Sequence, residues 1–280
     1  MNRHPALQKV WYTVNGLLVI SVLLFLYSLV RDYSTREYLK GFSDAVTPAG
    51  ATPEEKISEI LAWMEHGPAR RTGNASPGAV HDPEQTLNYK ALLRVCGSAT
   101  NAFVNLANSS GLQSRRLLLL SSDRGAKHVV AEVLIDGKWI VVDPAFRYIP
   151  RGTDGHLLTR QELSDPEVLR QATRNVSNYN LTYTYESTAH VRLARIPVIG
   201  RFLRSLLNYA VPGWEDSIWW TVLLERRSFA LLVSSFFLLL FFLLVRLLLR
   251  WYAESRYGIP RVRVRQRIKD AIRIVLGLTV

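Results

Sequence analysis

The stretch His128-Val-Val-Ala-Glu-Val-Leu-Ile-Asp-Gly-Lys-Trp-Ile-Val-Val-Asp143 decides the fold. Its centre, Asp136-Gly137, separates two apolar runs, and this dipeptide favours the tight turn of a β-hairpin because both residues tolerate positive φ. A two-residue loop sets Ile135 opposite Lys138. His128 and Asp143 then lie on one face of the sheet as diagonal neighbours, about 7–8 Å apart at the backbone. The pattern therefore predicts that an imidazole and a carboxylate can meet.

The opposite face of this hairpin is expected to be apolar and buried. Residues 116–120, which precede the hairpin, form another apolar run that suits a buried strand. Together these runs predict an antiparallel sheet. The residues expected on its buried face are Val129, Ala131, Val133, Ile135, Ile140 and Val142.

Upstream of the sheet, residues 96–108 have helical apolar spacing through Ala99, Phe103 and Leu106, and Gly111 can end the helix. Cys96 is thus expected at a helix N-terminus, where unpaired N–H groups and the helix dipole stabilise a thiolate. It is the only cysteine of the chain, so an internal disulfide and a multi-cysteine metal site are both excluded. Taken alone, such a cysteine is more often a buried structural residue.

A cysteine at a helix start, with a histidine and an aspartate that meet on a sheet, is typical of thiol acyl transfer. In this chemistry Cys96 attacks a carbonyl as the thiolate, and His128 accepts and returns the proton. Asp143 holds the tautomer of the ring and stabilises the imidazolium. We therefore expect Cys96, His128 and Asp143 to be catalytic, with no cofactor and no metal implied. The backbone N–H of Cys96 is the expected first oxyanion donor.

Residues 88–146 resemble the transglutaminase-like superfamily of papain-type folds, and the helix expected at residues 53–67 resembles it more loosely. In such proteins the cysteine begins a helix that ends in glycine and is followed by an arginine, here Arg115. The histidine opens a strand that leads to an Asp-Gly-Lys-Trp turn, and the aspartate closes the next strand. The resemblance implies an α+β fold, with the cysteine helix packed on an antiparallel sheet that carries the histidine and the aspartate.

The chain departs from the family pattern at three places. Arg94 stands where many members have glycine, and valines follow His128 where many have an aromatic residue. The side chain that completes the oxyanion hole is not identified by the pattern, and Asn88 and Tyr89 are only candidates for it. These departures leave room for an altered substrate cleft.

Two long apolar stretches flank the expected domain, at residues 10–30 and 228–249, and each is long enough to cross a bilayer as a helix. The first runs directly into Arg31-Asp32 without the small residues of a cleavage site, so we interpret it as an uncleaved anchor. From Arg246, near the end of the second stretch, to Val280, nine basic residues stand against Glu254 and Asp270. The positive-inside rule places that end in the cytoplasm.

The predicted organisation follows from these spans. It comprises a short cytoplasmic N-terminus (1–9), a transmembrane helix (10–30), an extracytoplasmic transglutaminase-like domain (31–190, core 53–165), an amphipathic juxtamembrane segment (191–227), a second transmembrane helix (228–249) and a basic cytoplasmic tail (250–280). Within the domain we expect a linker over residues 44–53, a capped helix over 53–67 and another over 159–168. The location is then a bacterial plasma membrane.

The formal charge of +12 fits this organisation, because most of it lies at the two ends and the intervening domain is close to neutral. The charge therefore reports membrane sidedness, and no nucleic-acid partner is expected since no stacking aromatics accompany the basic tail. We expect a peptide or protein amide substrate, with hydrolysis favoured over crosslinking. The alternative is a catalytically silent interaction module with a protein partner in an envelope or exopolysaccharide assembly system.

Overall fold

The computed structural model describes residues 5–67, 71, 81–121, 125–191 and 199–257. Most of the predicted basic tail, residues 250–280, lies outside these residues. The chain divides into two compact units, Met1–Tyr27 with Val233–Val280, and Ser28–Leu232.

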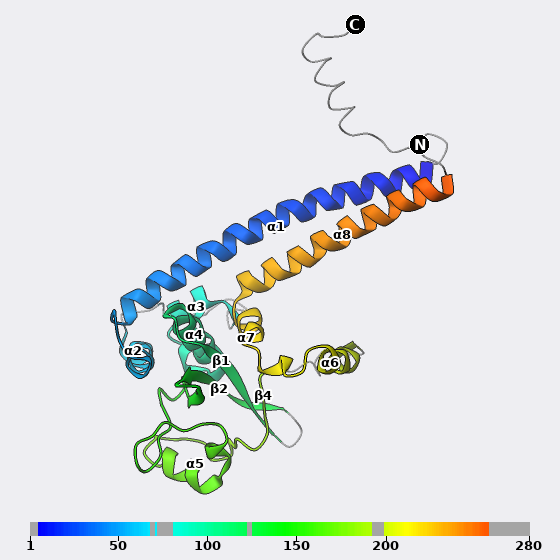
Figure 1. Ribbon diagram of the computed structural model, residues 1–280. Coiled ribbons are helices and arrows are strands. Elements are labelled where there is room, and N and C mark those ends of the chain that lie inside the picture. The colour runs from blue at the N-terminus through cyan, green and yellow to red at the C-terminus, as the bar shows by residue number, and fades with distance from the viewer. Residues whose placement is uncertain (1–4, 68–70, 72–80, 122–124, 192–198, 258–280) are drawn as a thin grey trace. The chain divides into compact units, whose positions relative to one another are not determined.

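The first unit contains the apolar parts of helices α1 (Pro5–Val46) and α8 (Arg227–Tyr257), which lie side by side (Figure 1). Both helices are long and apolar enough to cross a membrane. The rings of Phe25 and Phe236 lie 6.0 Å apart, and the guanidinium of Arg246 lies 5.8 Å from the centroid of the Trp11 ring. Each helix continues beyond the span expected from the sequence.

The second unit is an α+β domain, as predicted. Its four-stranded sheet has the order β3-β2-β1-β4, and all pairings are antiparallel. Its elements besides the ends of α1 and α8 are α2 (Pro53–His66), α3 (Pro83–Asn88), η2 (Leu92–Arg94), α4 (Cys96–Ser109), β1 (Ser114–Leu120), β2 (Ala126–Ile135), β3 (Lys138–Val142), η3 (Glu162–Ser164), α5 (Pro166–Thr173), β4 (Thr188–Ala189), α6 (Ile199–Ala210), η5 (Trp214–Asp216) and α7 (Ile218–Glu225).

The register predicted for the β2–β3 hairpin is confirmed, since Ile135 pairs with Lys138. The turn residues Asp136 and Gly137 have φ values of 48° and 78°. Both are positive, as a two-residue type I′ turn requires. The turn chemistry thus fixes which face of β2 each side chain occupies, and with it the position of His128.

Hydrophobic clusters cover both faces of the sheet. On the face predicted to be buried, Ala131, Val133 and Val142 pack against α2 and α4. Phe103 of α4 is fully buried there. The other face is also covered, because the chain that follows β3 folds back over Val130 and Val141. The covering residues are Leu158, Leu163, Leu169 and Tyr185. His128 and Asp143 are therefore enclosed by the protein.

The expected linker over residues 44–53 is shorter than predicted, because α1 continues to Val46. Leu39 is buried in the core, and Tyr38, Phe42 and Val46 pack against the same cluster. This helical spacing extends the apolar anchor into the domain. α2 then begins as predicted at Thr52, with reciprocal capping bonds to Glu55.

The prediction of one helix over residues 159–168 is wrong in its bounds. Thr159 and Glu162 form a reciprocal cap, but the turn that follows is only η3. Pro166 disfavours helical backbone at Asp165, which has a ψ of 119°. Asp165 instead caps α5, so the helix restarts at Pro166.

Candidate active site

Cys96 is the first residue of α4, as the sequence predicts. The turn before it is held by the hydroxyl of Ser98, which bonds to the carbonyls of Leu92 and Val95. One helical turn further along, Thr100 Oγ1 donates to the carbonyl of Val129 at 3.0 Å. Since Val129 follows His128 directly, this bond ties the cysteine helix to the histidine strand.

His128 and Asp143 meet as the hairpin register predicts. His128 Nε2 lies 2.8 Å from Asp143 Oδ2, and the two side chains are 2% and 1% exposed. The other carboxylate oxygen, Oδ1, accepts the backbone N–H groups of Ala145 and Phe146 at 3.1 and 3.3 Å. Both oxygens are thus occupied, so the carboxylate can turn neither away from the imidazole nor into water.

Cys96 completes the arrangement. Its side chain is half-buried and hydrogen bonded to that of His128. Because Nε2 of the imidazole is engaged by Asp143, Nδ1 is the nitrogen that faces the sulfur. The structure therefore brings all three predicted residues together in the order Cys96, His128, Asp143.

The environment favours a thiolate and imidazolium pair. The hydrogen bond with His128 lowers the pKa of Cys96, and backbone N–H groups of Val129 and Gly97 lower it further, against the opposing effect of burial. Burial by itself would lower the pKa of His128, but its bonds with Asp143 and Cys96 outweigh burial and raise that pKa to about 9. Both shifts favour the thiolate form of Cys96, which is the nucleophilic form of a cysteine.

The sequence analysis missed Arg147, which links the loop after Asp143 to the turn before Cys96. Its guanidinium donates to the carbonyls of Pro144 and Ala145 in its own loop, and Nη2 donates to the carbonyl of Leu93 at 2.7 Å. Its backbone has a φ of 55°, which is uncommon for a residue other than glycine. The one available signal is a basic residue four positions after the aspartate.

Neither candidate for the second oxyanion donor is linked to the site by a described contact. Asn88 Nδ2 donates to Tyr38 Oη at 3.1 Å and to the carbonyl of Glu84. The backbone of Tyr89 pairs with Arg71. These contacts hold the start of the domain to α1 and α3.

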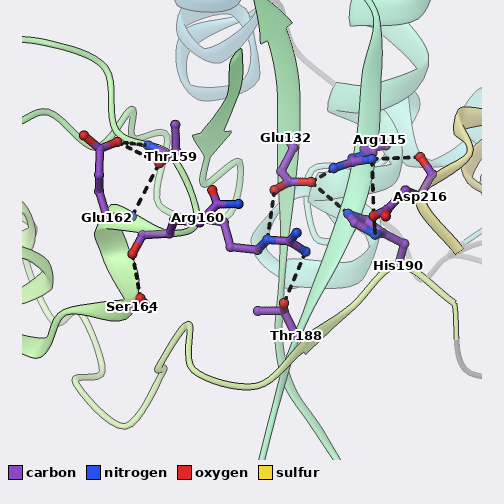
Figure 2. A network of polar contacts seen from close by, with 10 residues as sticks. Arg115, Glu132, Thr159, Arg160, Glu162, Ser164, Thr188, His190 and Asp216 are labelled. Atoms are coloured by element: carbon purple, nitrogen blue, oxygen red, sulfur yellow. Dashed lines mark hydrogen bonds and ion pairs between the residues drawn. The ribbon is translucent and has the colours of Figure 1, made fainter. Parts of the chain in front are cut away.

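A second buried polar cluster lies on β2, four residues beyond His128 (Figure 2). Glu132 accepts Arg115 Nε at 2.7 Å and His190 Nε2 at 2.8 Å. The far sides of both partners reach Asp216, where Nδ1 of His190 lies 3.1 Å from Oδ1. This cluster fastens η5 and the residue after β4 to strands β1 and β2. It also gives Arg115, the arginine of the family pattern, a buried partner.

A cavity of about 1130 Å³ lies between α2 and α5. Arg147 lines it, whereas Cys96, His128 and Asp143 do not. Within the described part of the chain, no group of three or more His, Cys, Asp or Glu side chains is arranged to hold a metal ion.

Residues 40–144 match the family model of the transglutaminase-like superfamily. The chain contains a transglutaminase-like domain. No curated protein and no solved structure matches the chain significantly. The matched region of the transglutaminase-like domain runs from the end of α1 through β3 and includes Cys96, His128 and Asp143. It stops before α5 and β4, so the residues that cover the second sheet face lie beyond the matched region.

Proposed function

We propose that the protein is a membrane-anchored cysteine hydrolase that cleaves amide bonds of peptides or proteins. The observation that carries this proposal is the continuous hydrogen-bonded series from the Cys96 sulfur through His128 to Asp143 Oδ2. A merely structural cysteine needs neither a buried imidazole beside it nor a carboxylate fixed behind that imidazole.

In the proposed reaction the Cys96 thiolate attacks the carbonyl carbon of the amide, and a carbon–sulfur bond forms. The oxyanion that develops is stabilised by backbone N–H groups at the start of α4. The imidazolium of His128 gives its proton to the nitrogen as the carbon–nitrogen bond breaks, and an amine leaves. His128 then takes a proton from water, which attacks the thioester, releases a carboxylic acid and restores the thiolate.

Water is the acceptor we propose, rather than an amine, because water reaches any half-buried thioester without a second binding site. Crosslinking needs a site that holds an amine against the thioester. The two outcomes are separated by incubating the purified protein with a glutamine-containing peptide and a fluorescent primary amine. Released ammonia without incorporated amine supports hydrolysis, whereas incorporated amine in preference to hydrolysis contradicts it.

We further propose that α1 and α8 both cross a bacterial plasma membrane and that the domain between them lies outside the cytoplasm. The basic residues that follow residue 245 support this orientation through the positive-inside rule. The exposed apolar residues Phe202 and Tyr209 of α6, 70% and 89% exposed, suit the headgroup layer. This proposal keeps the juxtamembrane role for α6 alone. α7, which belongs to the same predicted segment, packs on the domain, where buried Glu225 accepts from Asn101 and Arg116.

Because Cys96 is the only thiol, one labelling experiment tests the nucleophile and the orientation together. We expect a membrane-impermeant iodoacetamide to label Cys96 rapidly in intact cells, and His128→Ala to slow that labelling. Labelling that requires permeabilisation contradicts the orientation. Labelling that requires denaturation contradicts the nucleophile and favours the silent interaction module instead.

A further inference from the structure

The ring of Tyr183 lies parallel to the imidazole of His128. The ring centroids are 4.3 Å apart and the planes differ by only 2°. Phe146 contacts the same imidazole at 5.8 Å with its ring inclined by 62°. Tyr183 comes from the connection between α5 and β4, well beyond residue 144 where the family match ends.

We propose that Tyr183 is a positioning residue of the active site, whose ring holds the His128 imidazolium in line between Cys96 and Asp143 and favours its charged form. This inference rests on the proposed function, because it assigns Tyr183 a role in preparing the same nucleophile. It also makes the chain beyond the matched family region a part of the active site.

The physical basis is the charge distribution of an aromatic ring. Its face carries partial negative charge, so a cation stacked on it is stabilised, and more strongly where water is excluded. His128 is 2% exposed, so its imidazolium has little water to replace this contact. A parallel ring at 4.3 Å also blocks rotation of the imidazole out of its plane, which would break the bonds of both ring nitrogens.

Tyr183 is itself held in place. Tyr179 packs against Tyr183 nearly at right angles, with centroids 5.9 Å apart, and against Phe146 at 4.9 Å. The backbone N–H of Tyr183 donates to the carbonyl of Asn180 at 3.0 Å. The stacking ring is therefore part of an ordered aromatic cluster, and not a surface side chain that happens to lie over the histidine.

The charged and titratable groups that face His128 come from three elements. Cys96 comes from α4, Asp143 follows β3, and Tyr183 belongs to the α5–β4 connection, with Tyr179 behind it. Among these, only the aromatic contacts can be changed without removing a member of the proposed catalytic series. This makes Tyr183 separable by experiment from the residues it positions.

The test is the pH dependence of Cys96 alkylation by iodoacetamide in the full-length, detergent-solubilised protein, which measures the thiolate without requiring turnover. We expect Tyr183→Leu to raise the apparent pKa of Cys96 by about one and a half units, the size of a cation–π contact from which water is excluded. Tyr183→Phe keeps the ring and should leave the titration of Cys96 unchanged.

Trp63→Leu is the matched control, because it removes an aromatic ring that packs on Phe42 in the cluster on the other sheet face and has no described contact with His128 or Tyr183. An equal shift in Trp63→Leu and Tyr183→Leu, or no shift in Tyr183→Leu despite a folded circular dichroism spectrum, overturns the role of the stack. If the wild-type thiol itself titrates like a free cysteine, the proposed function fails, which is a distinguishable result. If Tyr183→Leu does not fold, Tyr183→His and Tyr183→Met replace it in the test, because their side chains fill the same space. We expect Tyr183→His to raise the apparent pKa of Cys96 by part of the shift, and Tyr183→Met by all of it.

Discussion

Arg147 Nη2 donates to the carbonyl of Leu93 at 2.7 Å, and this bond joins the loop that follows Asp143 to the turn that precedes Cys96. The same guanidinium also holds two carbonyls of its own loop. Two ends of the proposed catalytic series, distant in sequence, are thereby fixed to each other through one side chain.

We expect Arg147→Met to lower the free energy of unfolding by about 2–4 kcal/mol, because three carbonyls lose a charged donor. The rate of Cys96 alkylation should fall with it, since the sulfur is no longer held against the imidazole. Denaturant unfolding and alkylation at neutral pH measure the two effects. Arg151→Met is the control in the same region, because Arg151 is exposed and paired with exposed Glu54. Equal free energies of unfolding of Arg147→Met and Arg151→Met contradict the role of Arg147 in joining the two segments.

Asp143→Asn tests the orientation of the imidazole. The carboxylate accepts from His128 on one oxygen and from two backbone N–H groups on the other. An amide has only one acceptor oxygen. In one orientation its NH₂ group meets the backbone N–H groups of Ala145 and Phe146, and in the other it donates to Nε2 and leaves the proton on Nδ1, the tautomer that cannot accept a proton from Cys96. An unassisted cysteine is only a few per cent thiolate at pH 7, so we expect alkylation to slow about tenfold or more. Unchanged alkylation in Asp143→Asn rules out this role for Asp143.

The pKa values predict different pH profiles for alkylation and for amide hydrolysis. Both rates should increase with pH on the acid side as Cys96 ionises, and this increase should come below the ordinary pKa of a cysteine because the pKa of Cys96 is lowered. Hydrolysis also needs the imidazolium to protonate the leaving amine, so it should fall as the pH passes about 9, the pKa of His128. Alkylation needs no proton donor and should not fall there. A shared decline of both rates near pH 9 points to unfolding rather than to loss of the proton.

The same pKa of His128 affects stability. It is higher in the folded chain than the ordinary value of 6.5, so folding is favoured while the imidazole is protonated. This contribution is full below about pH 6.5, the ordinary pKa of histidine, declines as the pH rises, and is lost once the pH passes about 9. Denaturant unfolding of wild type and of His128→Gln across this interval should show a stability difference that narrows with rising pH.

The exposed face of α6 predicts contact with lipid. In a Cys96→Ser background, Phe202→Cys labelled with an environment-sensitive fluorophore should report an apolar surrounding in nanodiscs of anionic lipid. Arg204→Cys is the control on the opposite side of the helix, where the side chain pairs with Glu215. Similar emission from both positions contradicts the proposed interfacial helix.

The sequence predicts best what is decided locally. Asp136-Gly137 dictates the hairpin and its register, and from these alone follows the meeting of His128 with Asp143. The continuation of α1 into the core was also readable from the spacing of Leu39, Phe42 and Val46. The composition of residues 44–53, which is typical of a linker, led to the wrong start of that linker, because α1 continues to Val46.

The contacts of Arg147 and Tyr183 could not be predicted in the same way. Each depends on where a non-regular segment passes in three dimensions, and a lone arginine or tyrosine in such a segment has no periodicity to mark it. The chain after β3 returns over the second sheet face through turns, η3 and α5. No spacing rule relates its residues to β2.

Glu132 gives a prediction on stability alone. It is 1% exposed and accepts from both Arg115 and His190, which are themselves buried. Burial raises the pKa of Glu132, but the bonds from His190 and Arg115 outweigh it and lower the pKa below its ordinary range. The stability that this shift contributes is therefore present at neutral pH and is lost as the pH falls through the lowered pKa.

We expect Glu132→Gln to lower the free energy of unfolding at pH 7 by about 3–5 kcal/mol, because Arg115 and His190 lose their buried carboxylate and keep only the exposed Asp216. Glu167→Gln is the control, since its pair with Arg170 is exposed and should contribute less than about 1 kcal/mol. The difference between the two variants should shrink in acid, where wild-type Glu132 becomes protonated. Because Glu132 touches none of the proposed catalytic residues, the folded variant should keep the pH dependence of Cys96 alkylation. A shifted alkylation profile in Glu132→Gln contradicts this separation and makes the buried cluster part of the active site.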